Sequence, residues 1–249
     1  MKKILMLLAA ILLPVPLLAI TNTLSLSVAN YNGEGKNGTK ILNIIGDSYV
    51  KNHKRPVEEA WHYKMAKKLG LTYNNYGRNG GCVAFDRTHD GKYNFGPAMY
   101  TKTEQMDPAA DYVIIIGGHN DAFKVKDNKD SLIMFRDSLT LLITNIKTQC
   151  PHAKIGYVTP WYCDYPGFKQ VCKTILKVCK QHGVPVLNNY RKGSIIKVRD
   201  EEFRKKYFQG PKDTAHLNNA GHDLFLPVGM EWFLNNIINN DEICKPAHY

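Results

Sequence analysis

The stretch DYVIIIGGHND, residues 111–121, decides the fold of this 249-residue chain. Tyr112 to Ile116 form an unbroken, mostly β-branched run, and such runs form strands that are covered on both faces. The run ends at Gly117 and Gly118, and polar residues follow. The stretch therefore predicts a central strand of a parallel sheet whose carboxyl end carries polar side chains.

Strand-like and helix-like segments alternate outward from this run in both directions. A short apolar segment at residues 40–45 ends at Gly46, and Pro56 opens a helical pattern that stops at Gly70. This alternation is typical of a three-layer α/β/α sandwich with a mostly parallel, five-stranded sheet. The other predicted strands are residues 71–76, 154–158 and 184–187, the other predicted helices are residues 132–146, 168–181 and 220–238, and a long polar loop is predicted at residues 77–110.

The N-terminal part of the chain is expected to lie outside the folded domain. Residues 1–19 join a pair of lysines to an apolar run that ends near Ala19, which is the layout of a secretory signal peptide. An uncleaved membrane anchor is the alternative, because two prolines make the cleavage site irregular. Residues 20–39 form a polar leader, and residues 40–249 are enough for a single α/β domain. We expect export to the periplasm or the extracellular space.

The basic charge of the chain does not by itself indicate a nucleic-acid partner. The formal net charge is +11, and it falls to about +9 when Lys2 and Lys3 are removed with the signal. The remaining lysines are scattered, with no arginine-rich helix and no aromatic RNA-binding motif. We interpret the charge as a solvated cationic surface, and we expect no stable membrane partner once the signal is cleaved.

The six cysteines leave two interpretations open. In an exported chain they permit disulfides, whose pairing the sequence does not specify, and buried free thiols are the alternative. Cys172 and Cys179 share a face of the predicted helix at residues 168–181 but stand too far apart to bond each other. No pair has the C-x-x-C spacing of a zinc site, so we expect neither a metal nor another cofactor.

Four short motifs fall just after predicted strands or just before the last helix. They are GDSY with Ser48, GRNGG with Gly80, GGHND with Asn120, and DTAHLN with Asp213 and His216. Each motif alone is ordinary turn or capping chemistry. In a parallel sheet, however, loops beyond the carboxyl ends of the strands meet at one edge, so the motifs are expected to converge there.

In this order the motifs resemble those of the SGNH (GDSL-type) hydrolase family. GDS matches the first block of the family, the glycine of NGG the second, GxND the third and DxxH the fifth. The resemblance spans residues 41 to about 225 and implies a flavodoxin-like fold. Two positions depart from the pattern or leave a choice: Tyr49 replaces the leucine of GDSL, and Gly81 is a rival to Gly80 in the second block.

The resemblance also implies a role for each motif residue. Ser48 would attack an ester carbonyl, His216 would take the serine proton, and Asp213 would orient the imidazole. The oxyanion would be held by the Ser48 and Gly80 backbone N–H groups and by the Asn120 side chain. These residue types suit acyl transfer, which needs an activated hydroxyl, a base that titrates near neutrality and donors where negative charge develops.

The sequence thus predicts a secreted serine esterase that acts through an acyl-enzyme. Short acyl groups, above all acetyl, on a carbohydrate are the expected substrate, because no apolar lid segment is present and aromatic residues follow the fourth strand. His119, Trp161, Tyr162 and Tyr165 are candidates to line the cleft, whereas His222 is expected to be structural. The alternatives are a lipase or lysophospholipase for longer chains, and a catalytically silent glycan-binding protein.

Overall fold

A computed structural model of the chain describes residues 34–35, 38–191 and 193–240. The predicted signal peptide, most of the polar leader and Cys244 lie outside these residues. Ahead of the main sheet, β1 (Glu34–Gly35) and β2 (Gly38–Thr39) pair as a short antiparallel ribbon. In the part of the chain that the structure describes, no helix is both long and apolar enough to cross a membrane.

Five parallel strands form the central sheet, as predicted. They stand in the order β4-β3-β5-β6-β7, which is the flavodoxin-like order, and the chain reverses direction across the sheet between β3 and β5. The crevice beside such a reversal is where open α/β sheets bind ligands. The strands are β3 (Ile41–Gly46), β4 (Thr72–Gly77), β5 (Tyr112–Ile116), β6 (Lys154–Val158) and β7 (Val186–Leu187).

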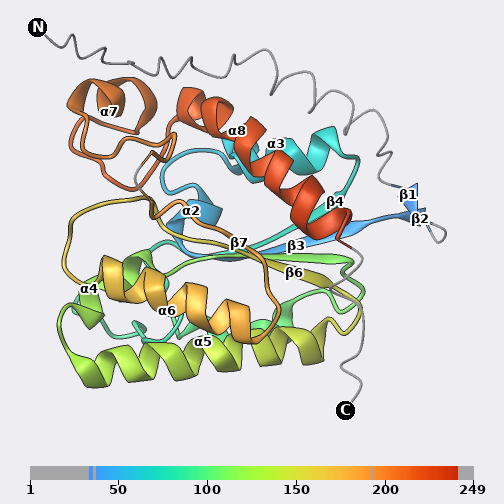
Figure 1. Ribbon diagram of the computed structural model, residues 1–249, viewed down its shortest axis with the longest axis horizontal. Coiled ribbons are helices and arrows are strands. Elements are labelled where there is room, and N and C mark those ends of the chain that lie inside the picture. Colours follow the sequence, from blue (N-terminus) through green and yellow to red (C-terminus); the bar gives the residue numbers. More distant parts are fainter. Residues whose placement is uncertain (1–33, 36–37, 192, 241–249) are drawn as a thin grey trace, which may run out of the picture.

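Helices cover both faces of the sheet, which confirms the three-layer architecture (Figure 1). α3 (Trp61–Lys68) and α8 (Asn219–Phe233) pack on one face, and α5 (Lys129–Gln149) and α6 (Phe168–Gln181) pack on the other. The short helices α2 (Ser48–Lys51), α4 (His119–Val125) and α7 (Glu201–Tyr207) lie near one end of the sheet.

Several predicted boundaries differ from the structure, and three of them differ for a clear local reason. The helix predicted from Pro56 is broken, because Ala60 is extended between a 3-10 turn (Val57–Glu59) and α3. The last strand starts at Val186 instead of residue 184, because the Val184 amide closes the end of α6 on Cys179 and Pro185 has no N–H to give. α8 ends at Phe233, and residues 234–238 continue as a π turn.

The core is built around strands that are buried on both faces. Ile44 and Ile114 sit side by side in β3 and β5, and neither is exposed to solvent. Above them, α8 approaches α3 closely at Gly229, where an added Cβ would overlap the indole of Trp61. This close approach holds the helix that follows the Asp213–His216 segment against the sheet.

The cysteines within the described residues are free thiols, so buried thiols rather than disulfides are the state of these five side chains. All five are buried, and burial raises the pKa of each described thiol, to about 11 for Cys163 and to about 12 for Cys179. A high pKa leaves little thiolate, which is the reactive form.

Candidate active site

Ser48 lies at the tight turn between β3 and α2. An added Cβ on Gly46 would overlap the backbone oxygen of Ile116 in the neighbouring strand, so only glycine fits at the end of β3. Asp47 caps α2 by accepting the Tyr49 amide at 2.9 Å, and its own amide donates to Ile116. The turn therefore presents the Ser48 side chain at the carboxyl edge of the sheet.

A continuous hydrogen-bonded relay joins Ser48 to a carboxylate. Ser48 Oγ lies 2.8 Å from His216 Nε2, and His216 Nδ1 lies 2.9 Å from Asp213 Oδ2. Asp213 also accepts the backbone amides of Ala215 and His216, each at 2.9 Å. Burial opposes the charge of Asp213, but the bonds from His216 and these amides hold its pKa below the usual value. A hydroxyl, an imidazole and a carboxylate in this series can activate the hydroxyl as a nucleophile.

The loop that carries Asp213 and His216 is fastened at both ends. The Gln209 amide donates to His216 O at 2.9 Å, and Asn218 Nδ2 donates to Phe208 O at 3.0 Å. Trp161 Nε1 donates to Ala215 O at 2.8 Å from the far side of the loop. These bonds fix the loop against the sheet and therefore fix where the imidazole points.

His53, which the sequence analysis did not single out, stacks on the ring of His216. Their centroids are 4.1 Å apart and the planes differ by 11°. His53 and Asn52 both have left-handed backbone conformations, with φ of +48° and +64°. Asn79, next to Gly80, donates to His53 O at 3.3 Å. Burial, His216 and Lys54 lower the pKa of His53.

The predicted oxyanion donors follow the ends of β3, β4 and β5, which are neighbours in the sheet. Among the described residues, the backbone N–H groups of Ser48 and Gly80 donate to no acceptor. The Gly81 N–H, by contrast, donates to Arg78 O at 3.1 Å. Asn120 Nδ2 donates to Gly81 O at 2.9 Å, which leaves its second proton for another acceptor. Gly80 therefore suits the donor role better than its neighbour Gly81.

Two buried carboxyl groups support these turns. Asp121 accepts the amides of Val83 and Ala84, each at 2.9 Å, and so ties the segment after Gly80 to α4. Burial raises the pKa of Asp121 to about 6 and the pKa of Asp47 to about 8, and the nearby charge of Asp121 adds to the rise at Asp47.

The residues predicted to line the cleft fall in different places. His119 is buried, its Nδ1 lies 3.0 Å from the Tyr49 hydroxyl, and burial lowers its pKa to about 4. Trp161 is buried against Tyr49 and, with Ser48, lines a cavity of about 10 Å³. Tyr162 is not among the residues that line this cavity, and it faces a separate groove with Tyr165.

His222 has the structural surroundings expected of it. Its Nδ1 accepts the Trp61 amide at 3.3 Å, and its Nε2 lies 3.0 Å from Asn52 Oδ1. Burial lowers its pKa to about 3, so the ring is neutral and bridges α3, α8 and the turn after α2. Within the described ranges, no three His, Cys, Asp or Glu side chains are grouped so that they could hold a metal ion.

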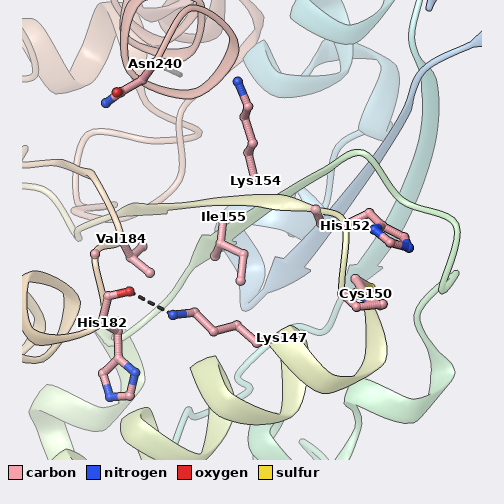
Figure 2. A pocket seen from close by; sticks show the side chains of 11 residues that line it. Lys147, Cys150, His152, Lys154, Ile155, His182, Val184 and Asn240 are labelled. Carbon is pink, nitrogen blue, oxygen red and sulfur yellow. Dashed lines mark hydrogen bonds between the residues drawn. The ribbon is translucent and has the colours of Figure 1, made fainter. Parts of the chain in front are cut away.

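A much larger cavity, of about 720 Å³, lies at the opposite end of the sheet (Figure 2). It is lined by His152 and Lys154 at the start of β6 and by the ends of α5 and α6. Lys147 crosses it to donate to His182 O at 2.8 Å. Because Ser48 lies at the carboxyl ends of the strands, this cavity is not part of the candidate site.

The fold and the Ser–His–Asp relay at the carboxyl edge of a parallel sheet define a serine hydrolase arrangement. The model of the GDSL-like Lipase/Acylhydrolase family matches residues 44–224. The chain belongs to this family, as the order of its motifs predicted, and it is therefore an ester hydrolase by class. A comparison with curated proteins gave no match.

Several solved structures share the fold. A protein from Lactobacillus plantarum is 20% identical, with a TM-score of 0.64, and the match covers 79% of this chain and 96% of that one. A member of the lipolytic G-D-S-L family from Veillonella parvula is 17% identical, with a TM-score of 0.53 and coverage of 78% and 98%. A family two carbohydrate esterase from Clostridium thermocellum in complex with cellohexaose is 13% identical, with a TM-score of 0.56 and coverage of 79% and 64%.

Proposed function

We propose that the chain is an exported serine esterase that removes short acyl groups, above all acetyl, from a carbohydrate. The observation that carries the proposal is the relay in which His216 Nε2 lies 2.8 Å from Ser48 Oγ while Nδ1 lies 2.9 Å from Asp213. This geometry lets the imidazole accept the serine proton and lets the carboxylate hold the tautomer that does so.

The reaction proceeds in two steps. In the first step Ser48 Oγ bonds to the ester carbonyl carbon, and its proton passes to His216 Nε2. When the tetrahedral species collapses, the bond to the leaving alkoxide breaks and His216 gives it the proton, which leaves an acyl-Ser48. In the second step a water molecule attacks this acyl group, again with His216 as the base, and releases the carboxylic acid and the free serine.

Donors beside Ser48 are suited to stabilise the tetrahedral species. The amides of Ser48 and Gly80 are without acceptors among the described residues, and Asn120 keeps one side-chain proton. Negative charge develops on the former carbonyl oxygen, and loss of one such donor costs about 3 to 4 kcal/mol of transition-state stabilisation.

The preference for a short acyl group rests on the cavity beside the nucleophile. The cavity that Ser48 lines measures about 10 Å³, which is about the volume a single water needs, and Trp61 and Trp161 are among the other residues that line it. A long alkyl chain does not fit in that space. The carbohydrate esterase among the structural neighbours supports, by likeness of fold, a sugar as the alcohol part. The basic and apolar N-terminal residues support export.

The proposal is tested by ester hydrolysis with a serine knockout. Wild-type protein should hydrolyse p-nitrophenyl acetate, and Ser48→Ala should lower kcat about 10⁴-fold or more, because only binding and oxyanion contacts remain. Ser138→Ala, at another buried serine, is the matched control and should keep full activity. Wild-type turnover in Ser48→Ala would refute the role of Ser48.

Two further measurements separate the rival functions. A series of p-nitrophenyl esters should peak at the acetate, whereas a peak at about eight carbons or longer would favour a lipase or lysophospholipase. A fluorophosphonate probe should label Ser48, whereas an unlabelled and folded protein would favour a catalytically silent glycan-binding protein. Export is checked by N-terminal sequencing of the protein recovered outside the cytoplasm, which should begin near Ile20.

A further inference from the structure

Two aromatic side chains stand exposed next to the candidate active site. Phe123 is 42% exposed and Tyr165 is 45% exposed, and their ring centroids are 5.5 Å apart. Both also contact the fully buried Phe168, which anchors the pair to α6. Exposure of two adjacent large rings leaves apolar surface in water that a ligand would cover.

A series of ring contacts links this pair to the residues beside Ser48. Phe123 lies on α4, one helical turn after Asn120, and its ring is 5.4 Å from the ring of His119. His119 is in turn 5.4 Å from the ring of Tyr49, the residue that follows Ser48. Because Tyr49 and His119 are buried, this row of contacts runs beneath the surface from the residue next to Ser48 to the exposed ring of Phe123.

Beyond Tyr165 the surface is hollowed into a groove. The groove has a volume of about 560 Å³ and is lined by three tyrosines, Tyr162, Tyr165 and Tyr190. Its polar lining residues are Asp127, Asp164, Gln170, Lys169 and Lys173. Tyr162 and Tyr190 lie 5.1 Å apart at a tilt. Arg199 pairs with Asp164 and lies over the ring of Tyr162, which fixes the position of this tyrosine. We call this feature, with Phe123, the tyrosine groove.

The chemistry of the tyrosine groove suits a sugar rather than an acyl chain. A sugar ring has an apolar face that packs on aromatic rings and hydroxyl groups at its rim that carboxylates and amides can bind. An alkyl chain would cover the carboxylates and the amide without giving them hydrogen bonds, and such burial is unfavourable. The volume of the groove is in the range of sites that hold small ligands.

We propose that the tyrosine groove binds the glycan chain that carries the ester, so that the residues remote from Ser48 hold several sugar units while the acylated unit reaches the nucleophile. This inference rests on the proposed function, since it assigns the carbohydrate part of the same substrate. It makes Tyr165 and Tyr162 determinants of affinity for long glycans and gives them no part in the chemistry.

Binding is measured first, on Ser48→Ala protein, so that no turnover is needed. Calorimetric titration with cellohexaose, xylohexaose and chitohexaose should show saturable binding of at least one, with a Kd of about 1 mM or tighter. Tyr165→Ala and Tyr162→Ala should each weaken that binding about tenfold, whereas Tyr165→Phe, which keeps the aromatic face, should retain it. Tyr93→Ala, at an exposed ring on a separate loop, is the matched control and should bind as the parent does.

Turnover then distinguishes the groove from the catalytic residues. Tyr165→Ala in the active protein should leave kcat/KM on p-nitrophenyl acetate unchanged and should lower kcat/KM on acetylated xylan about fivefold or more, through KM. Absence of binding to all three hexasaccharides at about 10 mM, or binding that Tyr165→Ala does not weaken, would overturn the inference. Absence of esterase activity in the wild type would instead overturn the proposed function, and the measured glycan binding would remain valid.

Discussion

His53 and His216 present the faces of their rings to each other, and the proposed mechanism gives this contact a role. During acyl transfer His216 becomes an imidazolium, and the face of a neutral aromatic ring attracts a cation. The lowered pKa of His53 keeps its own ring neutral, so that it does not repel the cation. The left-handed backbone at His53 costs roughly 1 kcal/mol or more, a strain that is common at functional sites.

Replacement of His53 should therefore affect turnover more than binding. Asn tolerates the left-handed conformation, so His53→Asn removes the ring without adding backbone strain, and kcat on p-nitrophenyl acetate should fall about tenfold with KM nearly unchanged. His53→Phe keeps the stacked ring and should retain most of kcat. Equal losses in both variants would mean that the imidazole nitrogens of His53, not its face, are what matters.

At this scale the sequence predicted the residues that form motifs and missed those that depend on distant packing. Ser48, Asp213 and His216 were identifiable because their types and order suit one chemistry, and the structure brings them within hydrogen-bond distance. His53 lies in a plain polar turn, and its role depends on where a loop more than 150 residues later is placed. No local pattern encodes such a contact.

At the scale of elements, the contact between α3 and α8 depends on one small side chain. Gly229 lies inside α8, where alanine would be favoured by about 1 kcal/mol on helix propensity alone. A Cβ at this position would overlap the indole of Trp61, which is itself packed against Phe225. The overlap with Trp61 should outweigh the helix propensity of alanine, because a buried tryptophan has little room to move.

Gly229→Ala should accordingly lower the free energy of unfolding by about 1 to 3 kcal/mol. Urea denaturation followed by circular dichroism measures the change. Gly210→Ala serves as the control because an added Cβ there meets no atom within 4 Å, so its stability should match the wild type. A stability gain in Gly229→Ala would show that propensity outweighs packing at this helix contact.

The elements themselves were largely predictable, and the errors are local. Apolar runs of strand length, such as Tyr112–Ile116, encode their state directly because both faces of the sheet are covered. The segment after Pro56 has helical periodicity but is broken at Ala60, whose extended backbone ends the 3-10 turn and begins α3. The pairing order of the strands follows from topology rules, whereas the start of β7 depends on how α6 ends.

For the whole molecule, buried ionisable groups predict a maximum of stability near pH 6.5. Burial lowers the pKa of His62, His119 and His222 to about 4, 4 and 3, so below pH 6.5 the unfolded chain binds protons that the folded chain does not, and stability falls. Asp47 changes the stability with pH in the opposite direction. With its pKa raised to about 8, Asp47 stays protonated in the fold while it ionises in the unfolded chain above about pH 4, so its contribution to stability falls as the pH rises and is lost once the pH passes 8.

Urea titrations at several pH values between about 4.5 and 9 should therefore give a bell-shaped curve of unfolding free energy. For each proton that only one of the two states binds, the free energy of unfolding changes by about 1.4 kcal/mol per pH unit. Asp47→Asn should flatten the alkaline side, because the amide cannot ionise. His222→Gln should flatten the acid side for the same reason. A wild-type curve that rises steadily from pH 6.5 to 9 would contradict the raised pKa of Asp47.

The thiols provide a second test of the whole fold. Native protein should react very slowly with a disulfide reagent such as DTNB, because the five described thiols are buried and their pKa values are raised. In denaturant, without added reductant, at least five thiols per chain should react at once. Fewer than five would mean that disulfides form in the protein as it is isolated.

The loop that holds Asp213 and His216 leaves one distance, from His216 Nε2 to Ser48 Oγ, as the main geometric variable of the reaction. Both side chains lie within one turn of chain, and the Asp213 carboxylate binds the backbone amide of His216 as well as its ring. Carboxylate and imidazole are thus held together as one unit. Any displacement of this unit relative to α2 would change the distance from Nε2 to Ser48 Oγ while the other half of the relay stays intact, so the hydrogen bonds that fasten the loop ends control the reaction through this one distance.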